Sequence, residues 1–494
     1  MYLLSSRRIT KIRGSTPFIV TTVFLAVFSD TFMYGVIIPV IPFAFQSRMG
    51  VTKNDVESWI SRSLAIYSVG LLLGSVIFGY ACDRVNMRRG MMVGGLLVIS
   101  ASCIILCLTK SLPLYLVGRL IQGISAAVVW TVGLALIADT ADSGQVAYLM
   151  AFPGIGVNLG FFAGPLIGGI VYEKSGYYSV YYVCFGLLFV DMVVRLLMLE
   201  KKELNKRMKK FDTDEQGEIL EVSTLSHNSN EVNEAIENDK NCPQNLEENE
   251  IPSPLHYHIH SIDTVFGIKV PPIIGLLKHS TVVVSLFQAF VISWIMSAIE
   301  TTLTLHLNEI FHFTSMGASL MTLPLAVSSF IEPFVGKMSD KMGPKFLVTL
   351  GFVSLIPFLI ILRVPNHDSV NQIAMFAAFV ALNGAAFSLI FSPIMGELCK
   401  IVSVVEAQNP GRFGPGKGMG QVYGLFNFSF SLGALIGPFH AGGVYLKVGW
   451  NTTVLSLGIM SAISSIPTFL FTGGNVISRW QNKDFRLNHW RETI

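Results

Sequence analysis

Two carboxylates stand inside long apolar segments of this 494-residue chain. Asp30 lies within Ala26–Thr31, and Glu300 lies within Ser297–Thr301. A carboxyl group in surroundings of low dielectric is stable as the neutral acid, so it can take up and release a proton, or it can pair with a cation. The structural alternative is a carboxyl group held by neighbouring hydroxyls. We interpret both residues as proton-coupling or substrate-binding groups.

Two further charged residues and several polar or aromatic side chains are also candidates for a functional site. Arg119 lies within an apolar run and must find an anion, a carbonyl or water, unless it snorkels from near a helix end. Glu332, in Phe330–Pro333, has a structural and a functional interpretation of similar weight. We expect Asp139, and Asp191 with Arg195, to pair locally or with loop cations. The candidates for lining a cavity are Tyr34, Tyr67, Gln122, Trp130, Trp294, Asn383 and Asn427, although Trp and Tyr in membranes also serve as interface anchors.

The composition predicts that these groups are surrounded by lipid. Hydrophobic residues make up 51% of the chain and charged residues only 14%, whereas soluble proteins carry roughly 25% charged residues. A net charge of +3 argues against nucleic acid as a partner. The six cysteines lack the spacing of metal ligands, and no nucleophile–base set or phosphate-binding loop is present, so we expect no metal, no cofactor and no enzyme activity.

Twelve apolar runs are long enough to cross a bilayer, which takes about 20 helical residues. The sequence therefore predicts an all-α membrane protein with six spans in each half. The predicted spans are 17–45, 59–82, 90–109, 112–138, 146–172 and 178–199, then 279–307, 316–338, 345–363, 371–396, 419–445 and 450–472.

The basic residues predict the topology. Those that follow the second, sixth, eighth, tenth and last spans all fall on the side of the basic N-terminus, which places both termini in the cytoplasm. The expected domains are a tail over 1–16, a six-helix bundle over 17–199, a linker over 200–275, a second bundle over 276–472 and a tail over 473–494. The linker has an acidic, Asn-rich stretch at 212–250, so we expect it to be largely disordered.

Two motifs occur once in each half, which predicts a duplicated six-helix unit. The first motif follows the second and eighth spans, and its residues are Gly79, Asp83, Arg84 and Arg88 in one copy and Gly336, Asp340 and Lys341 in the other. An Asp at a helix terminus beside a cation can form a breakable latch between helices, or simply a tight turn with topological charges.

The second motif is rich in glycine. It comprises Gly160, Gly164, Pro165 and Gly168 in the fifth span and Gly433, Gly437 and Pro438 in the eleventh. Serial glycines on one face allow close helix packing, and the proline favours a kink. We expect these helices to form a rocking interface, the alternative being plain small-residue packing.

These motifs resemble those of the major facilitator superfamily. Gly79–Arg89 is similar to its signature loop, with Asn86 and Met87 as departures, and Gly118–Gly123 resembles its Arg-x-x-Gln-Gly element. Gly154–Gly169 is similar to the antiporter signature of proton-coupled drug exporters. Phe28–Pro39, Ser392–Glu397 and Val422–Asn427 resemble the drug:proton antiporter and vesicular amine transporter branch, especially its fungal members. By that resemblance, two carboxylates and a lysine of amine transporters are replaced by Ser388, Asn427 and Tyr67.

The resemblance implies a secondary transporter that works by alternating access. We expect proton-coupled antiport of an amphipathic or cationic organic molecule, by a monomer in the plasma membrane or a vacuolar or vesicular membrane. By resemblance, Arg119 would tune proton movement. The alternatives are a nutrient or metabolite uniporter or symporter, and a non-transporting membrane receptor or scaffold.

Overall fold

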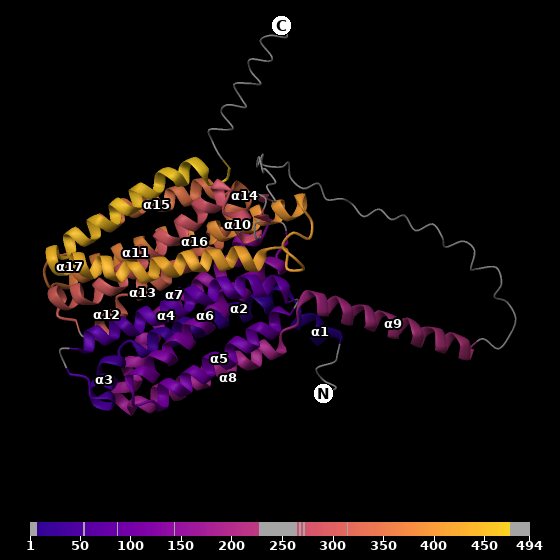
Figure 1. The fold of residues 1–494 in the computed structure, drawn as a ribbon, viewed down its shortest axis with the longest axis horizontal. Coiled ribbons are helices and arrows are strands. Elements are labelled where there is room, and N and C mark those ends of the chain that lie inside the picture. Colours follow the sequence, from indigo (N-terminus) through magenta and orange to yellow (C-terminus); the bar gives the residue numbers. More distant parts are fainter. Residues whose placement is uncertain are drawn as a thin grey trace, which may run out of the picture.

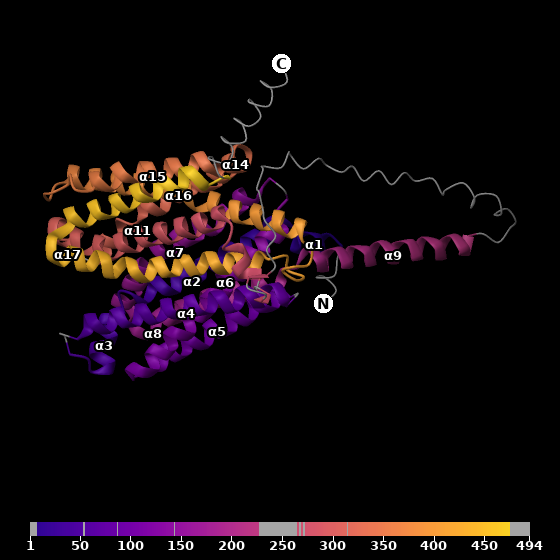
Figure 2. The same cartoon turned by 45° about the horizontal axis from the view of Figure 1, so that its top comes forward.

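Two helical bundles lie side by side in the computed structural model, which describes residues 7–52, 55–85, 87–142, 144–226, 264–265, 268–269, 272–313 and 315–474. The N-terminal half forms one bundle and the C-terminal half the other (Figure 1). Their long helices run in the same general direction, as the turned view also shows (Figure 2).

The N-terminal half contains the six predicted spans. A short helix, α1 (Arg7–Arg13), precedes them. The spans are α2 (Thr16–Ile37), α4 (Val56–Arg84), α5 (Arg88–Leu108), α6 (Leu112–Thr140), α7 (Val146–Ser175) and α8 (Tyr177–Leu197). The prediction of one continuous helix over 17–45 was wrong, because the chain breaks after Ile37, near Pro39, and resumes as α3 (Ile41–Met49).

The C-terminal half contains the other six. The spans α11 (Ser280–Phe311), α15 (Pro344–Ile361) and α16 (Val370–Gln408) are continuous. The predicted span 316–338 is divided into α12 (Ser315–Leu320), α13 (Leu323–Ser328), the 3-10 turn η2 (Ser329–Ile331) and α14 (Glu332–Met342). Pro324 and Pro333 each lie in the first turn of a segment, where proline is tolerated.

The last helix, α17 (Met419–Phe471), supplies two spans. Its 53 residues would measure about 80 Å as one straight helix, far more than a bilayer thickness. The chain turns at Gly449, whose φ of 79° and ψ of 179° are not helical. With the divided eighth span counted once, the 11 candidate spans of the described residues therefore give twelve, as predicted.

Each half begins and ends at the same end of the bundle. The Arg13 side chain donates to the Leu197 carbonyl at 2.6 Å, so the start of α2 meets the end of α8. In the second half, Thr281 Oγ1 donates to the Phe471 carbonyl at 3.3 Å. This end, where α1 also lies, is called the latch end below.

The region between the halves is only partly described. Its first part, expected to be disordered, instead forms the helix α9 (Lys201–Ser226), in which Glu203 and Arg207 pair one turn apart. The pairs Thr264–Val265 and Ile268–Lys269 form the short antiparallel strands β1 and β2, and α10 (Pro272–Leu276) follows. Residues 227–263 lie outside the described residues, so their predicted disorder stays a prediction.

Candidate functional site

Asp30 is buried in the middle of α2, with 2% of its surface exposed. Trp130 of α6 donates its indole N–H to Asp30 Oδ2 at 3.3 Å, while Asp30 Oδ1 has no hydrogen-bond partner among the described residues. Tyr67 of α4 lies close enough to interact with the same carboxyl group. The carboxyl is therefore only partly satisfied, which suits a group that exchanges ligands.

An aromatic pair separates Asp30 from the other predicted carboxylate. The rings of Tyr34 and Tyr67 have centroids 4.8 Å apart. Tyr34 lies one turn beyond Asp30 on α2, about 6 Å along the axis, and within electrostatic range of Glu300 and Arg119. Tyr34 thus connects Asp30 of one half to Glu300 of the other.

Glu300 differs from Asp30 in its exposure. It is exposed although it lies well inside α11, and it lies within electrostatic range of Tyr34, which belongs to the opposite half. Thr304, one turn further along α11, is exposed as well. The surface of α11 around Glu300 is therefore more open than the surroundings of Asp30.

Arg119 is fully buried and has no carboxylate partner among the described residues. It donates to Ser63 Oγ at 3.2 Å and to Gln122 Oε1 at 3.0 Å, while its Nη2 and the Gln122 Nε2 have no hydrogen-bond partner in the described part of the chain. Tyr34 and Tyr115 lie 5.9 and 6.0 Å from its guanidinium carbon. Because it is buried, Arg119 is not a snorkelling arginine.

Aromatic rings close the seam on the latch side of Asp30. Trp130 stacks on Phe430 of α17 with centroids 6.1 Å apart. Phe430 in turn packs against Phe391 and Phe426, with centroids 6.0 Å away in both cases. Asp30 is therefore shielded from the latch end by rings from both halves.

The glycine motifs allow close packing against α2, which carries Asp30, in one half and against α11, which carries Glu300, in the other. An added Cβ on Gly160 would lie 2.0 Å from Thr31 Oγ1, and one on Gly168 would lie 2.3 Å from the Val36 carbonyl. In the other half, a Cβ on Gly437 would lie 2.2 Å from Ser297 Oγ. The glycines therefore set the positions of α2 and α11 within each half, and the rocking of these faces stays a prediction.

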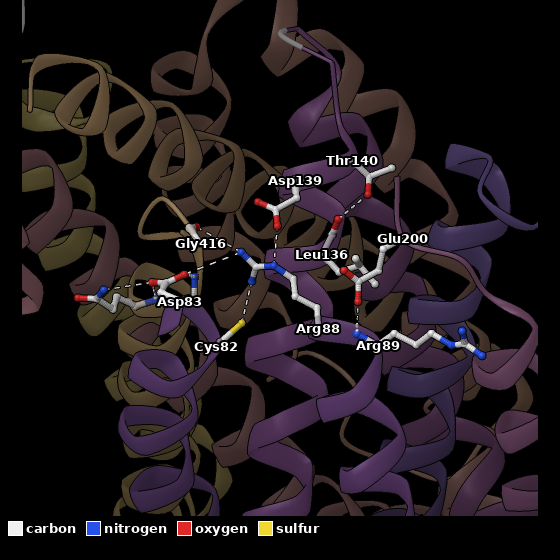
Figure 3. Close-up of polar contacts among 11 residues, drawn as sticks. Cys82, Asp83, Arg88, Arg89, Leu136, Asp139, Thr140, Glu200 and Gly416 are labelled. Carbon is white, nitrogen blue, oxygen red and sulfur yellow. Dashed lines mark hydrogen bonds and ion pairs between the residues drawn. The ribbon is translucent and has the colours of Figure 1, made fainter. Parts of the chain in front are cut away.

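The first latch joins α4 to the beginning of α17 (Figure 3). Asp83 is fully buried and accepts the backbone N–H groups of Gly420 and Gln421 at 2.8 and 2.9 Å. These residues form the first turn of α17, which has no capping side chain of its own. Asp83 therefore caps a helix of the opposite half.

Arg88 completes this latch (Figure 3). Its Nη2 lies 3.8 Å from Asp83, its Nε lies 2.5 Å from Asp139, and it donates to the Gly416 carbonyl at 3.3 Å. The prediction that Asp139 pairs with a loop cation is confirmed. A cavity of about 280 Å³ adjoins the latch, with Lys201 among its lining residues.

The second latch repeats the arrangement with the halves exchanged. Asp340 of α14 accepts the backbone N–H groups of Ala147 and Tyr148, the first turn of α7, at 3.2 and 2.9 Å. Its cation is Lys400 of α16, at 3.5 Å. A Cβ on Gly336 would lie 2.4 Å from the Ala147 carbonyl, so glycine permits this approach.

Two predicted latch residues lie elsewhere. Arg84 is exposed and its guanidinium carbon lies 5.2 Å from the Tyr80 ring centroid, and Lys341 is exposed too. The sequence missed Lys400, because it comes from a helix 60 positions away from Asp340. The Asp191–Arg195 pair, predicted as structural, is confirmed as a buried ion pair at 2.6 Å.

Three of the predicted cavity residues bind other parts of the protein. Trp294 donates to His440 Nδ1 at 3.2 Å within the C-terminal half. Asn383 donates to the Phe358 and Phe379 carbonyls. Asn427 donates to Ser75 Oγ at 2.6 Å, which joins α17 to α4. These three side chains therefore have hydrogen-bond partners other than Asp30, which composition does not reveal.

Comparisons with known proteins agree with this architecture. The sequence pattern of the Major Facilitator Superfamily matches residues 23–408. An uncharacterized MFS-type transporter of Schizosaccharomyces pombe is 30% identical over 92% of this chain and 96% of its own length. The class B tetracycline resistance protein of Escherichia coli is 25% identical over 66% of this chain and 67% of its own length.

A solved structure shares the fold. The human organic anion transporter MFSD10 (TETRAN) aligns with a TM-score of 0.64, covering 92% of this chain and 99% of that chain at 16% identity. The family pattern spans most of the chain. This chain therefore belongs to the Major Facilitator Superfamily and is an integral membrane transporter.

Proposed function

We propose that this transporter is a proton-coupled antiporter of an amphipathic or cationic organic molecule. The observation that carries the proposal is the pair Asp30 and Glu300, which lie on equivalent helices of the two halves, on either side of the Tyr34–Tyr67 aromatic pair. A monomer contains both carboxylates, so the pathway needs no second copy.

Competition for one carboxylate couples the two flows. The neutral Asp30 carboxyl holds a proton next to Trp130 and Tyr67. When a cationic substrate approaches, the O–H bond breaks, the proton leaves to water in the seam, and the carboxylate pairs with the cation. Because one carboxylate cannot hold both, release of the substrate requires a proton to return.

Each residue around the carboxylates has a distinct part in this scheme. Glu300 is exposed at the seam, farther from the latch end than Asp30, and meets an exported substrate last, before release. The rings of Tyr34, Tyr67 and Trp130 offer faces to an amphipathic or cationic body. Arg119, with an unpartnered Nη2, repels a second cation and holds the polar network with Gln122.

The latches support alternating access. Both latches are closed in this structure, aromatic rings cover the latch side of Asp30, and Glu300 remains exposed. The basic residues at the latch end support its assignment to the cytoplasm. In that orientation the structure is closed to the cytoplasm and open to the other side, from which the substrate would leave.

The resemblance to a tetracycline resistance protein supports export of an organic molecule. Export to the outside and sequestration in an acidic organelle have the same direction relative to the cytoplasm. The plasma membrane and a vacuolar or vesicular membrane are therefore both compatible with the scheme.

The test is proton and substrate flux in proteoliposomes. The probes are tetraphenylphosphonium and tetracycline, the membrane potential is clamped with potassium and valinomycin, and a lumenal dye reports pH. We expect an imposed pH gradient to drive accumulation, reversal of the gradient to reverse it, and Asp30→Asn with Glu300→Gln to abolish it.

The matched control is Glu309→Gln. Glu309 lies on α11 like Glu300, but it accepts a hydrogen bond from the Tyr445 hydroxyl within its own half at 2.6 Å. Its replacement should preserve gradient-driven flux. Flux that ignores the gradient, or that survives the double replacement of Asp30 and Glu300, would contradict the proposal.

A further inference from the structure

Glu332 is a third buried carboxyl, and it belongs to the seam between the halves. It is the first residue of α14, directly after the 3-10 turn η2, and 2% of its surface is exposed. Its side chain points into α7 of the opposite half, where a Cβ on Gly154 would lie 1.9 Å from Glu332 Oε2. Only glycine at position 154 leaves room for this carboxyl group.

The carboxyl group of Glu332 has almost no polar neighbours. Asn158 of α7 donates to Oε1 at 3.5 Å, and Oε2 has no partner among the described residues. Among the described residues, no charged side chain acts on it. The elements that pack there bear their charged or titratable groups elsewhere: Lys337, Asp340 and Lys341 on α14, Tyr148, Tyr172, Glu173 and Lys174 on α7, Glu397, Cys399, Lys400 and Glu406 on α16, and Lys345 on α15.

An ionised carboxylate would be costly in this position. It would be buried without a cation and with a single long hydrogen bond, which nothing in the surroundings offsets. The neutral acid fits the same space. The joined arrangement of α14 and α7 is therefore compatible with one protonation state of Glu332.

Separation of the halves at the latch end removes this restriction on the protonation state of Glu332. Glu332 lies two turns from Asp340 on the same short helix, so breaking the second latch draws α14 away from α7. The carboxyl then meets water and can ionise at little cost. The protonation state of Glu332 is thus linked to whether the halves are joined.

We propose that Glu332 is a proton-binding site of the seam that is occupied when the latch end is closed and emptied when it opens. On opening, the O–H bond breaks and the proton passes to water at the latch end. Closing requires a proton to be taken up again. The inference rests on alternating access, but it does not require Asp30 or Glu300 to bind protons or substrate.

The experiment measures the closed-to-open ratio against pH without any substrate. Paired fluorophores are attached at Asp142→Cys and Met342→Cys, whose native side chains are exposed and belong to opposite halves. Cys242 is replaced by serine, and the five described cysteines are buried. The protein is the full chain in lipid nanodiscs.

A single linked proton changes the closed-to-open ratio by up to about tenfold per pH unit. We expect wild type to open as pH rises from 6 to 9, and Glu332→Gln to stay closed throughout. Gly154→Ala, which displaces the carboxyl, should shift the ratio toward open by at least about tenfold at pH 6, whereas Gly169→Ala, whose Cβ meets nothing within 4 Å, should not.

The result separates this site from the transport carboxylates. The Asp30→Asn, Glu300→Gln double variant should keep the pH-dependent opening even if it transports nothing. A wild-type ratio that is independent of pH, the same pH dependence in Glu332→Gln, or its loss in the double variant would each overturn the proposal. If Glu332→Gln does not fold, the comparison of Gly154→Ala with Gly169→Ala tests the proposal. A shift toward open in Gly154→Ala alone supports it, and equal ratios in the two variants contradict it.

Discussion

Replacing Asp83 with asparagine should open the latch end of this transporter. Asn keeps the shape of the side chain, but only one of its two terminal atoms is an acceptor, whereas the two backbone N–H groups now bind separate oxygens of Asp83. The other buried N–H then faces an amide NH₂ group. Arg88 keeps its ion pair with Asp139, so no cation is left unpaired.

The expected change in the free energy of opening follows from these lost interactions. One buried N–H without an acceptor costs about 1–3 kcal/mol, and removing a negative charge from a helix N-terminus costs about 0.3–1 kcal/mol. The two effects overlap, so we expect about 2–3 kcal/mol in total, which corresponds to a shift of roughly 30- to 150-fold toward open.

The assay is the closed-to-open ratio reported by the fluorophores at 142 and 342. These positions flank the second latch, so the change at Asp83 does not touch them. Asp340→Asn should produce a shift of similar size, because Asp340 caps α7 in the same way.

The control uses the basic residues that the motif places next to each aspartate. Arg84→Gln and Lys341→Gln alter exposed side chains and should change the ratio less than about twofold. An Arg84→Gln shift as large as that of Asp83→Asn would refute the assignment of the latch to backbone capping and to Arg88.

Three further predictions concern packing, pH and the Asp30 environment. Gly168→Ala should lower Tm by several degrees because its Cβ would collide with the α2 backbone, at a cost of about 1–3 kcal/mol, whereas the adjacent Gly169→Ala should leave Tm unchanged because its Cβ meets nothing. Burial and a neighbouring arginine hold the pKa of His279 below its usual value, so the folded state binds fewer protons than the unfolded state. Stability should therefore fall as pH drops through the ordinary histidine range, and His279→Gln should weaken this dependence of Tm between pH 7.5 and 5.5. Trp130→Phe removes the N–H bonded to Asp30 but keeps a stacked ring, so kcat/KM for proton–cation exchange in proteoliposomes should fall about tenfold; an unchanged value would remove Trp130 from the mechanism.

The spans could be predicted from the sequence because lipid demands long uncharged runs. The boundary between 419–445 and 450–472 was predicted, and the chain turns there at Gly449. The breaks in the first and eighth spans were missed. Their signals were Pro39, Pro324 and Pro333, but proline also occurs inside intact helices, as Pro165 does in α7.

The site was only partly predictable, for a geometric reason. Asp30 and Glu300 were predicted as carboxylates inside apolar runs, and the repeat located both latch aspartates. Arg88 was among the predicted latch residues, but its burial in preference to Arg84 and the role of Lys400 could not be predicted, because the partner of a charge depends on which helices become neighbours. Trp294 and Asn383 illustrate the same limit, since their direction depends on helix rotation.

The reciprocal capping by Asp83 and Asp340 gives the transporter a built-in reporter. The amide hydrogens of Gly420, Gln421 and Tyr148 have acceptors only while the two halves touch. Whenever the halves part, these few hydrogens become free to exchange with deuterium from the solvent. Their exchange rate therefore reports how often the halves separate in the unlabelled, unmutated protein. A compound that traps one conformation would change the deuterium content, and so the mass, of the two short peptides that contain these amides.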